Sequence, residues 1–125
     1  MEGIATLKVT ENLLAPALKT GTVRVMSTAA MAALMEEAAC NALAKVGTNG
    51  KAHVGVSLEL KHKKPSAIGA NVKAVAKLCK SDNKKYNFDI EVFDETGLVG
   101  SAKHTRVAVD QQSFEDRCNE NARKA

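Results

Sequence analysis

The sequence is poor in aromatic residues, with no Trp, one Tyr and three Phe among 125 residues. Proteins that hold single-stranded nucleic acid stack its bases on aromatic rings, and this chain offers few rings for that purpose. Its net charge of +4 suits a small ligand with phosphate groups as well as it suits a nucleic acid. We therefore expect no nucleic-acid partner.

Long apolar runs and a disulfide framework are also absent. No apolar run approaches the ~20 residues of a membrane span, and residues 1–5 lack the features of a signal peptide. The cysteines, Cys40, Cys79 and Cys118, are odd in number and far apart, which indicates reduced thiols. We expect a cytoplasmic protein with no membrane partner. Its size predicts one domain over residues 1–125.

An alanine-rich run from Ser27 to Gly47 is the most informative stretch. Ala, Leu, Met and Glu favour helix, Ser27 or Thr28 can cap its start, and Gly47 can end it. The helix is apolar on almost every side, so we expect a sheet to wrap it. Glu36 falls in a sector of small residues. A carboxylate desolvated there should have a raised pKa, which suits a general base.

Alternating apolar residues predict strands on both sides of this helix. Two short strands are expected before it, at 4–9 and 21–26, with a loop or helical turn between them around Pro16. Four strands are expected after it, at 54–62, 68–80, 86–93 and 98–109, with a turn at 81–83. This order is typical of an α+β fold with one helix across an antiparallel sheet. The tail, 111–125, predicts a short helix that starts near Ser113, or a frayed end.

Alternation along 54–62 puts Val54, Val56 and His62 on the face toward the helix, and His53 on the other face. On the last strand, His104 shares one face with Gly100, Ala102 and Arg106. The three histidines lack metal-ligand spacing, so no metal site is expected.

Three side chains can converge where the helix starts and the 54–62 strand ends, namely Thr28, Glu36 and His62. Together they offer a hydroxyl, a base and a proton carrier. Each also has a structural interpretation: Thr28 as the N-cap, Glu36 as a solvated residue, and His62 as a hydrogen-bonded core residue.

The stretch from Met26 to Glu36 resembles the helix-start motif of hotdog-fold acyl-CoA thioesterases, and most closely that of the fluoroacetyl-CoA thioesterase-like family. Later residues agree with it in order and spacing: Gly55, His62, Pro65, Gly69, Val72, Gly100, His104 and Arg106. The resemblance implies a hotdog fold, in which an antiparallel sheet wraps a long central helix. It also implies a homodimer or a dimer of dimers, with acyl-CoA bound near the dimer interface.

The resemblance further implies hydrolysis of an acyl-CoA thioester to free acid and CoA. Thr28, Glu36 and His62 take the catalytic positions, and Gly55 offers a backbone N–H near the thioester. Lys61, Lys63 and Lys64 are candidates to meet the CoA phosphates, or else form a solvated basic surface. No cofactor is implied, since coenzyme A enters as part of the substrate.

One segment departs from the family. The fluoroacetate enzyme carries a phenylalanine lid just before the helix, whereas residues 13–26 contain no aromatic residue. We therefore expect a different acyl group. Two other functions stay open at this point: a non-catalytic hotdog protein that binds acyl-CoA or another small ligand, and a basic nucleic-acid module.

Overall fold

The computed structural model describes residues 1–82 and 84–125. The elements in chain order are β1 (Glu2–Lys8), the short helices η1 (Glu11–Leu13) and α1 (Ala15–Leu18), α2 (Thr28–Val46), β2 (Ala52–His62), β3 (Asn71–Asp82), β4 (Lys85–Asp94), β5 (Gly97–Val109) and α3 (Gln111–Lys124). The predicted α+β class is confirmed.

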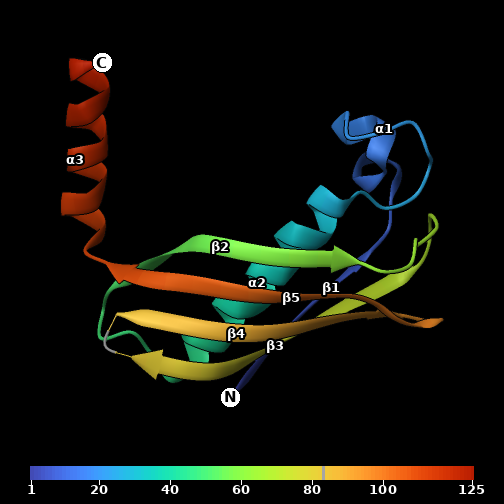
Figure 1. Ribbon diagram of the computed structural model, residues 1–125, viewed down its shortest axis with the longest axis horizontal. Helices are drawn as coiled ribbons and strands as arrows, with labels where there is room; N and C mark the ends of the chain where they lie inside the picture. Colours follow the sequence, from blue (N-terminus) through green and yellow to red (C-terminus); the bar gives the residue numbers. More distant parts are fainter. Residues whose placement is uncertain (83) are drawn as a thin grey trace.

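The five strands form one antiparallel sheet in the order β1-β3-β4-β5-β2. Helix α2 lies across one face and packs chiefly on β1 and β3 (Figure 1). Strands β1 and β2 are the two edges of the sheet, and α2 packs closely on β1 but contacts β2 only slightly. The backbone of an unpaired edge strand is free to pair with another strand.

Helix α2 begins where the sequence predicts, and Ser27 is the N-cap of the two residues that the sequence offers. The Ser27 hydroxyl accepts a hydrogen bond of 2.9 Å from the Ala30 N–H. Its apolar face is buried from Ala30 to Leu43, and Met31 and Met35 expose none of their surface, whereas Val46 in the last turn is exposed. The sheet does not wrap the helix all round, however, because Ala29 and Ala33 are exposed.

The contact between β1 and α2 is close enough to require a glycine. A Cβ atom on Gly3 would lie 2.1 Å from the Ala38 carbonyl oxygen and 2.2 Å from the Ala42 nitrogen. Both are backbone atoms, which cannot rotate away. The strand and the helix therefore meet backbone to backbone at this point.

Three predictions about local structure are wrong. Residues 21–26 form no strand, and an isolated bridge between Leu14 and Met26 is the only pairing in this part of the chain. The prediction of a turn at 81–83 is wrong for Ser81 and Asp82, because both belong to β3. Asn83 lies outside the described residues. The tail does form a helix, α3, but its cap is Asp110, which accepts from the Ser113 N–H.

A β-bulge between Gly55 and Ser57 overturns the predicted alternation in the first half of β2. Leu58, Leu60 and His62 face inward as predicted, but Val56 is 57% exposed. An extra residue in a strand reverses the faces of the residues before it. Gly55 and His53 consequently face α2 and β5, where the sequence pattern puts them on the opposite face.

No helix among the described residues is long and apolar enough to span a membrane.

Candidate active site

Thr28 and His62 form one half of the candidate site. The Thr28 Oγ1 atom lies 2.9 Å from His62 Nδ1, within hydrogen-bond distance. Because Ser27 caps the helix, the Thr28 hydroxyl is free to make this contact. A hydroxyl held against an imidazole nitrogen is the arrangement that activates an oxygen nucleophile. The interpretation of Thr28 as the N-cap is therefore wrong.

The other nitrogen of His62 is left without a partner. Across residues 1–82 and 84–125, His62 Nε2 is the one buried side-chain polar atom with no hydrogen bond. Burial lowers the pKa of His62 below its ordinary value, and the backbone of Lys64 opposes this shift only in part. A neutral imidazole whose Nδ1 accepts from Thr28 carries its proton on Nε2. None of the described residues accepts a hydrogen bond from that N–H group.

Glu36 and Gly55 form the second half of the candidate site. We call the group of Glu36, Gly55, His104 and Arg106 the Glu36 corner. A Cβ atom on Gly55 would lie 2.8 Å from Glu36 Oε1 and 3.2 Å from both Arg106 Nη1 and His104 Cε1. The bulge turns Gly55 toward the helix and brings it opposite Arg106. The absence of a side chain leaves room for another group to approach the Gly55 backbone.

A buried arginine orders the floor of this corner. Arg106 Nε donates to His53 Nδ1 over 2.9 Å, and Arg106 Nη1 lies 3.2 Å from His104 Nε2. His104 Nδ1 lies 2.7 Å from the Ser57 carbonyl oxygen, so Nδ1 donates and Nε2 accepts. Burial and the Arg106 charge both lower the pKa of His53 and of His104. Both histidines are therefore favoured in the neutral form.

The sequence pattern put His104 and Arg106 on one face but assigned them no role, and it missed His53. The signal that could have identified His53 is the bulge, which depends on the pairing of β2 with β5. The spacing of His53 and Arg106 in the sequence does not reveal that pairing.

The two halves lie apart within one chain. Thr28 and Glu36 are eight residues apart on α2, which corresponds to about 12 Å at 1.5 Å per residue. Glu36 is exposed, as are Ala29 and Ala33 on the neighbouring turns. The single chain therefore does not bury the Glu36 carboxylate among alanines as the sequence suggested.

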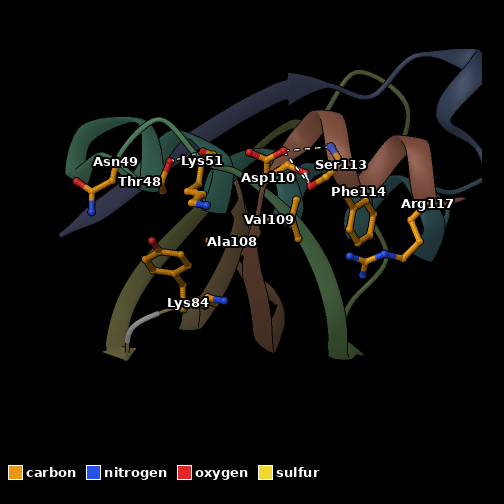
Figure 2. Close-up of a pocket in the computed structure, with 11 residues that line it drawn as sticks. Thr48, Asn49, Lys51, Lys84, Ala108, Val109, Asp110, Ser113, Phe114 and Arg117 are labelled. Atoms are coloured by element: carbon orange, nitrogen blue, oxygen red, sulfur yellow. Dashed lines mark hydrogen bonds between the residues drawn. The ribbon is translucent and has the colours of Figure 1, made fainter.

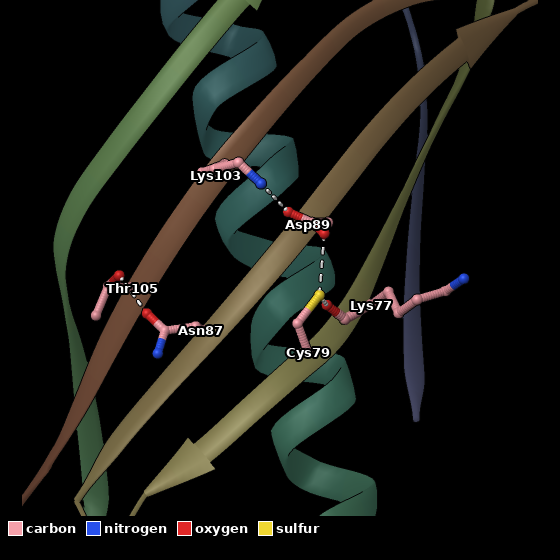
Figure 3. A network of polar contacts seen from close by, with 6 residues as sticks. All are labelled: Lys77, Cys79, Asn87, Asp89, Lys103 and Thr105. Atoms are coloured by element: carbon pink, nitrogen blue, oxygen red, sulfur yellow. Dashed lines mark hydrogen bonds and ion pairs between the residues drawn. The ribbon is translucent and has the colours of Figure 1, made fainter.

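The three predicted CoA-contacting lysines follow the open side of β2. Lys61 and Lys63 line a cleft of about 720 Å³, together with acidic residues that include Glu59 and Asp89. Asp89 accepts from Lys103 over 2.8 Å and from the Cys79 thiol over 3.1 Å, two contacts that Figure 3 marks with dashed lines. Lys64 is exposed beyond the end of the strand. Contact of these lysines with CoA stays a prediction.

No group of three or more His, Cys, Asp or Glu side chains in the described residues is arranged to hold a metal ion.

The sequence pattern that defines the fluoroacetyl-CoA-specific thioesterase (FlK) family matches residues 9–112. The chain belongs to this family. No protein with a curated description matches the chain. The family assigns the chain to the acyl-CoA thioesterases, enzymes that hydrolyse a thioester.

Solved structures support the hotdog fold. The fluoroacetyl-CoA thioesterase FlK superposes with a TM-score of 0.89 at 19% identity, over 96% of this chain and 93% of that one. A thioesterase superfamily member from Thermus thermophilus gives 0.90 at 21% identity, over 99% and 92%. A hot-dog-like protein from Thermanaerovibrio acidaminovorans gives 0.85 at 22% identity, over 97% and 90%.

Proposed function

We propose that this thioesterase hydrolyses acyl-CoA at a composite site in a homodimer. Thr28 and His62 come from one subunit, and Glu36 and Gly55 come from its partner. The observation that carries the proposal is the split site. Among the described residues, one chain holds a Thr–His pair whose imidazole Nε2 has no hydrogen-bond partner and, about 12 Å along the same helix, the exposed carboxylate of Glu36.

A two-fold axis through the open alanine sector of α2 would join the halves. Ala29 and Ala33 lie between Thr28 and Glu36, and small residues let two antiparallel helices approach closely. In that arrangement each helix start meets the partner's Glu36. The free edge of β2, with Val56 exposed at its centre, would pair with its copy and extend the sheet across the dimer.

The composite site gives each group a role. Glu36 of the partner subunit accepts from His62 Nε2–H and so holds the tautomer in which Nδ1 is the base. His62 Nδ1 removes the proton from the Thr28 hydroxyl as Oγ1 attacks the thioester carbonyl carbon. The backbone N–H of Gly55 of the partner subunit donates to the developing oxyanion, which lowers the barrier by about 3–4 kcal/mol in comparable sites.

The remaining steps regenerate the enzyme. The carbon–sulfur bond breaks, and His62 returns the proton to the departing thiolate as free CoA leaves. A water molecule then gives its proton to His62 and attacks the acyl-Thr28 ester. The acid departs, and Thr28 regains its proton. An FlK variant has been solved with fluoroacetate and CoA, the two products of such a reaction.

Mixing two inactive variants tests the composite site. Thr28→Ala and Glu36→Gln should each abolish thioester hydrolysis alone. Refolded together in equal amounts, they should regain about one quarter of wild-type activity, because half of the dimers are hybrids with one intact site. If each site lies within one chain, mixing restores nothing.

Two further measurements test the chemistry. A panel of acyl-CoA thioesters should give turnover, and the absence of turnover with every acyl group would contradict the proposal. Rapid quenching followed by mass measurement should detect an acyl group on Thr28 before steady state is reached. If turnover is present without an adduct, water attacks directly and Thr28 only orients it.

A further inference from the structure

A second site lies at the end of the sheet where α3 leaves β5. The turn after α2, the start of β4 and the first turns of α3 enclose a pocket of about 350 Å³ (Figure 2). This volume falls in the range of small-molecule sites. We call it the α3 pocket, and the residues that matter for its chemistry are Lys51, Lys84, Tyr86, Asp110, Phe114 and Arg117.

The α3 pocket gathers positive charge from three separate segments. Lys51 precedes β2, Lys84 precedes β4, and Arg117 lies on α3. Within the described residues none of these three cations forms a salt bridge with an acidic side chain. The cleft on the open sheet face is different, because there Lys103 is paired with Asp89 at 2.8 Å. The unpaired cations of the α3 pocket are available to an anionic ligand.

Among the described residues that line the α3 pocket, Asp110 is the one acid, and its carboxylate already has hydrogen-bond partners. Asp110 accepts from the Ser113 N–H over 3.0 Å and from the Ser113 hydroxyl over 2.9 Å. These bonds and the nearby Lys51 charge lower the pKa of Asp110. Asp110 therefore caps α3, and the pocket keeps an excess of positive charge.

One wall of the α3 pocket carries an aromatic ring next to Arg117. Phe114 is 43% exposed on a helix that buries none of its residues, while Tyr86, which also lines the pocket, is buried. Figure 2 shows Phe114 and Arg117 side by side on the pocket wall that α3 forms. An exposed ring next to cations suits a planar base that is attached to phosphate groups.

The α3 pocket also lies close to the Glu36 corner of the same chain. Val109 and Ala108, which line the pocket, pair with Ala52 and His53 on β2, and Gly55 follows on the same strand. Gly55 follows Ala52 by three positions along the strand, which corresponds to about 10 Å. A ligand with its reactive carbonyl at Gly55 and an extended arm along β2 would reach the pocket.

We propose that the α3 pocket binds the phosphorylated adenosine nucleotide of coenzyme A. Lys51, Lys84 and Arg117 contact its phosphates, and Phe114 stacks on its adenine ring. The link to catalysis rests on the proposed thioesterase site, but the binding itself is measured without turnover.

Calorimetry on the full chain with free CoA, dephospho-CoA, ADP and pantetheine tests the binding. CoA should bind most tightly and pantetheine, which lacks the nucleotide, most weakly. Lys84→Ala and Arg117→Ala should each weaken CoA binding about tenfold and leave pantetheine binding unchanged. Lys73→Ala is the matched control, since it removes one exposed cation from β3, away from both sites, and should change neither.

Several results would overturn the proposal: equal affinity for CoA and pantetheine, unchanged CoA affinity in both variants, or displacement of CoA by inorganic phosphate as readily as by ADP. Loss of CoA binding in Lys63→Ala alone would place the nucleotide at the other end of β2.

Kinetics separate this proposal from the proposed function. Lys84→Ala should raise KM about tenfold for an acyl-CoA, with kcat unchanged, and should leave the hydrolysis of acyl-pantetheine as it is. If neither thioester is hydrolysed while CoA still binds through Lys84 and Arg117, the catalytic proposal fails and the nucleotide site stands.

Discussion

Replacing Gly3 with alanine should destabilise the protein strongly, although the change adds only one methyl group. The new Cβ would lie 2.1 Å from the Ala38 carbonyl oxygen and 2.2 Å from the Ala42 nitrogen. Strand β1 and helix α2 must separate to admit it. Overpacking costs about 1–3 kcal/mol, and we expect the upper end, about 3 kcal/mol, because the contacted atoms are backbone.

Urea unfolding followed by circular dichroism measures this loss directly. In a chain of this size it corresponds to a fall of roughly 10 °C in Tm. Gly21→Ala is the matched control, since its Cβ would meet nothing closer than the Ala15 Cβ at 3.6 Å. That variant should be unchanged or slightly more stable, by about 0.4–1 kcal/mol.

Substitution of a third glycine, Gly100, should give an intermediate loss of stability. In Gly100→Ala the new Cβ would lie 2.5 Å from Met31 Sδ, at the flexible end of a side chain that can adjust. Its loss of stability should fall between those of the other two variants. A Gly3→Ala protein within about 0.5 kcal/mol of wild type would refute the close approach of β1 to α2.

Three more predictions follow from the same structure. The pKa of His104 is lowered in the folded state, so the unfolded state binds more protons below about pH 6.5, and the free energy of unfolding should fall as the pH drops from 7 to 5. His104→Gln should flatten this dependence of stability on pH. An unchanged slope would contradict the contact between neutral His104 and Arg106. Ser27→Ala should cost about 1 kcal/mol in chemical unfolding through loss of the cap on Ala30, and a neutral result would mean that another group caps α2. Val56→Lys should shift the protein toward monomer in analytical ultracentrifugation and lower its activity, whereas a dimer that persists at all concentrations would refute pairing through β2.

Local sequence determined most of the secondary structure. The helix from Thr28 to Val46 follows from helix-forming residues between a capping Ser27 and a terminal Gly47. The inward phase of Leu58, Leu60 and His62 follows from simple alternation. These features depend on neighbours within a few residues, so a single sequence contains the information.

Long-range pairing decided the rest. The bulge at Gly55 forms because β2 pairs with β5, about fifty residues away in the chain, and it reversed the predicted positions of His53 and Val56. Segment 21–26 has a strand-like pattern, but no strand lies in position to pair with it. Alternation shows which residues share a face only while the register stays regular.

The candidate site shows the same division. The sequence and the family resemblance pointed to Thr28, Glu36, His62 and Gly55 as residue types suited to thioester chemistry. Only the fold brought the Thr28 hydroxyl to His62 Nδ1 and put Glu36 about two turns further along α2. It also gathered Lys51, Lys84 and Arg117, each from a different segment, around one pocket. A sequence specifies which groups are present and their local order, whereas distances between segments are set by how the helix packs on the sheet and how the strands pair.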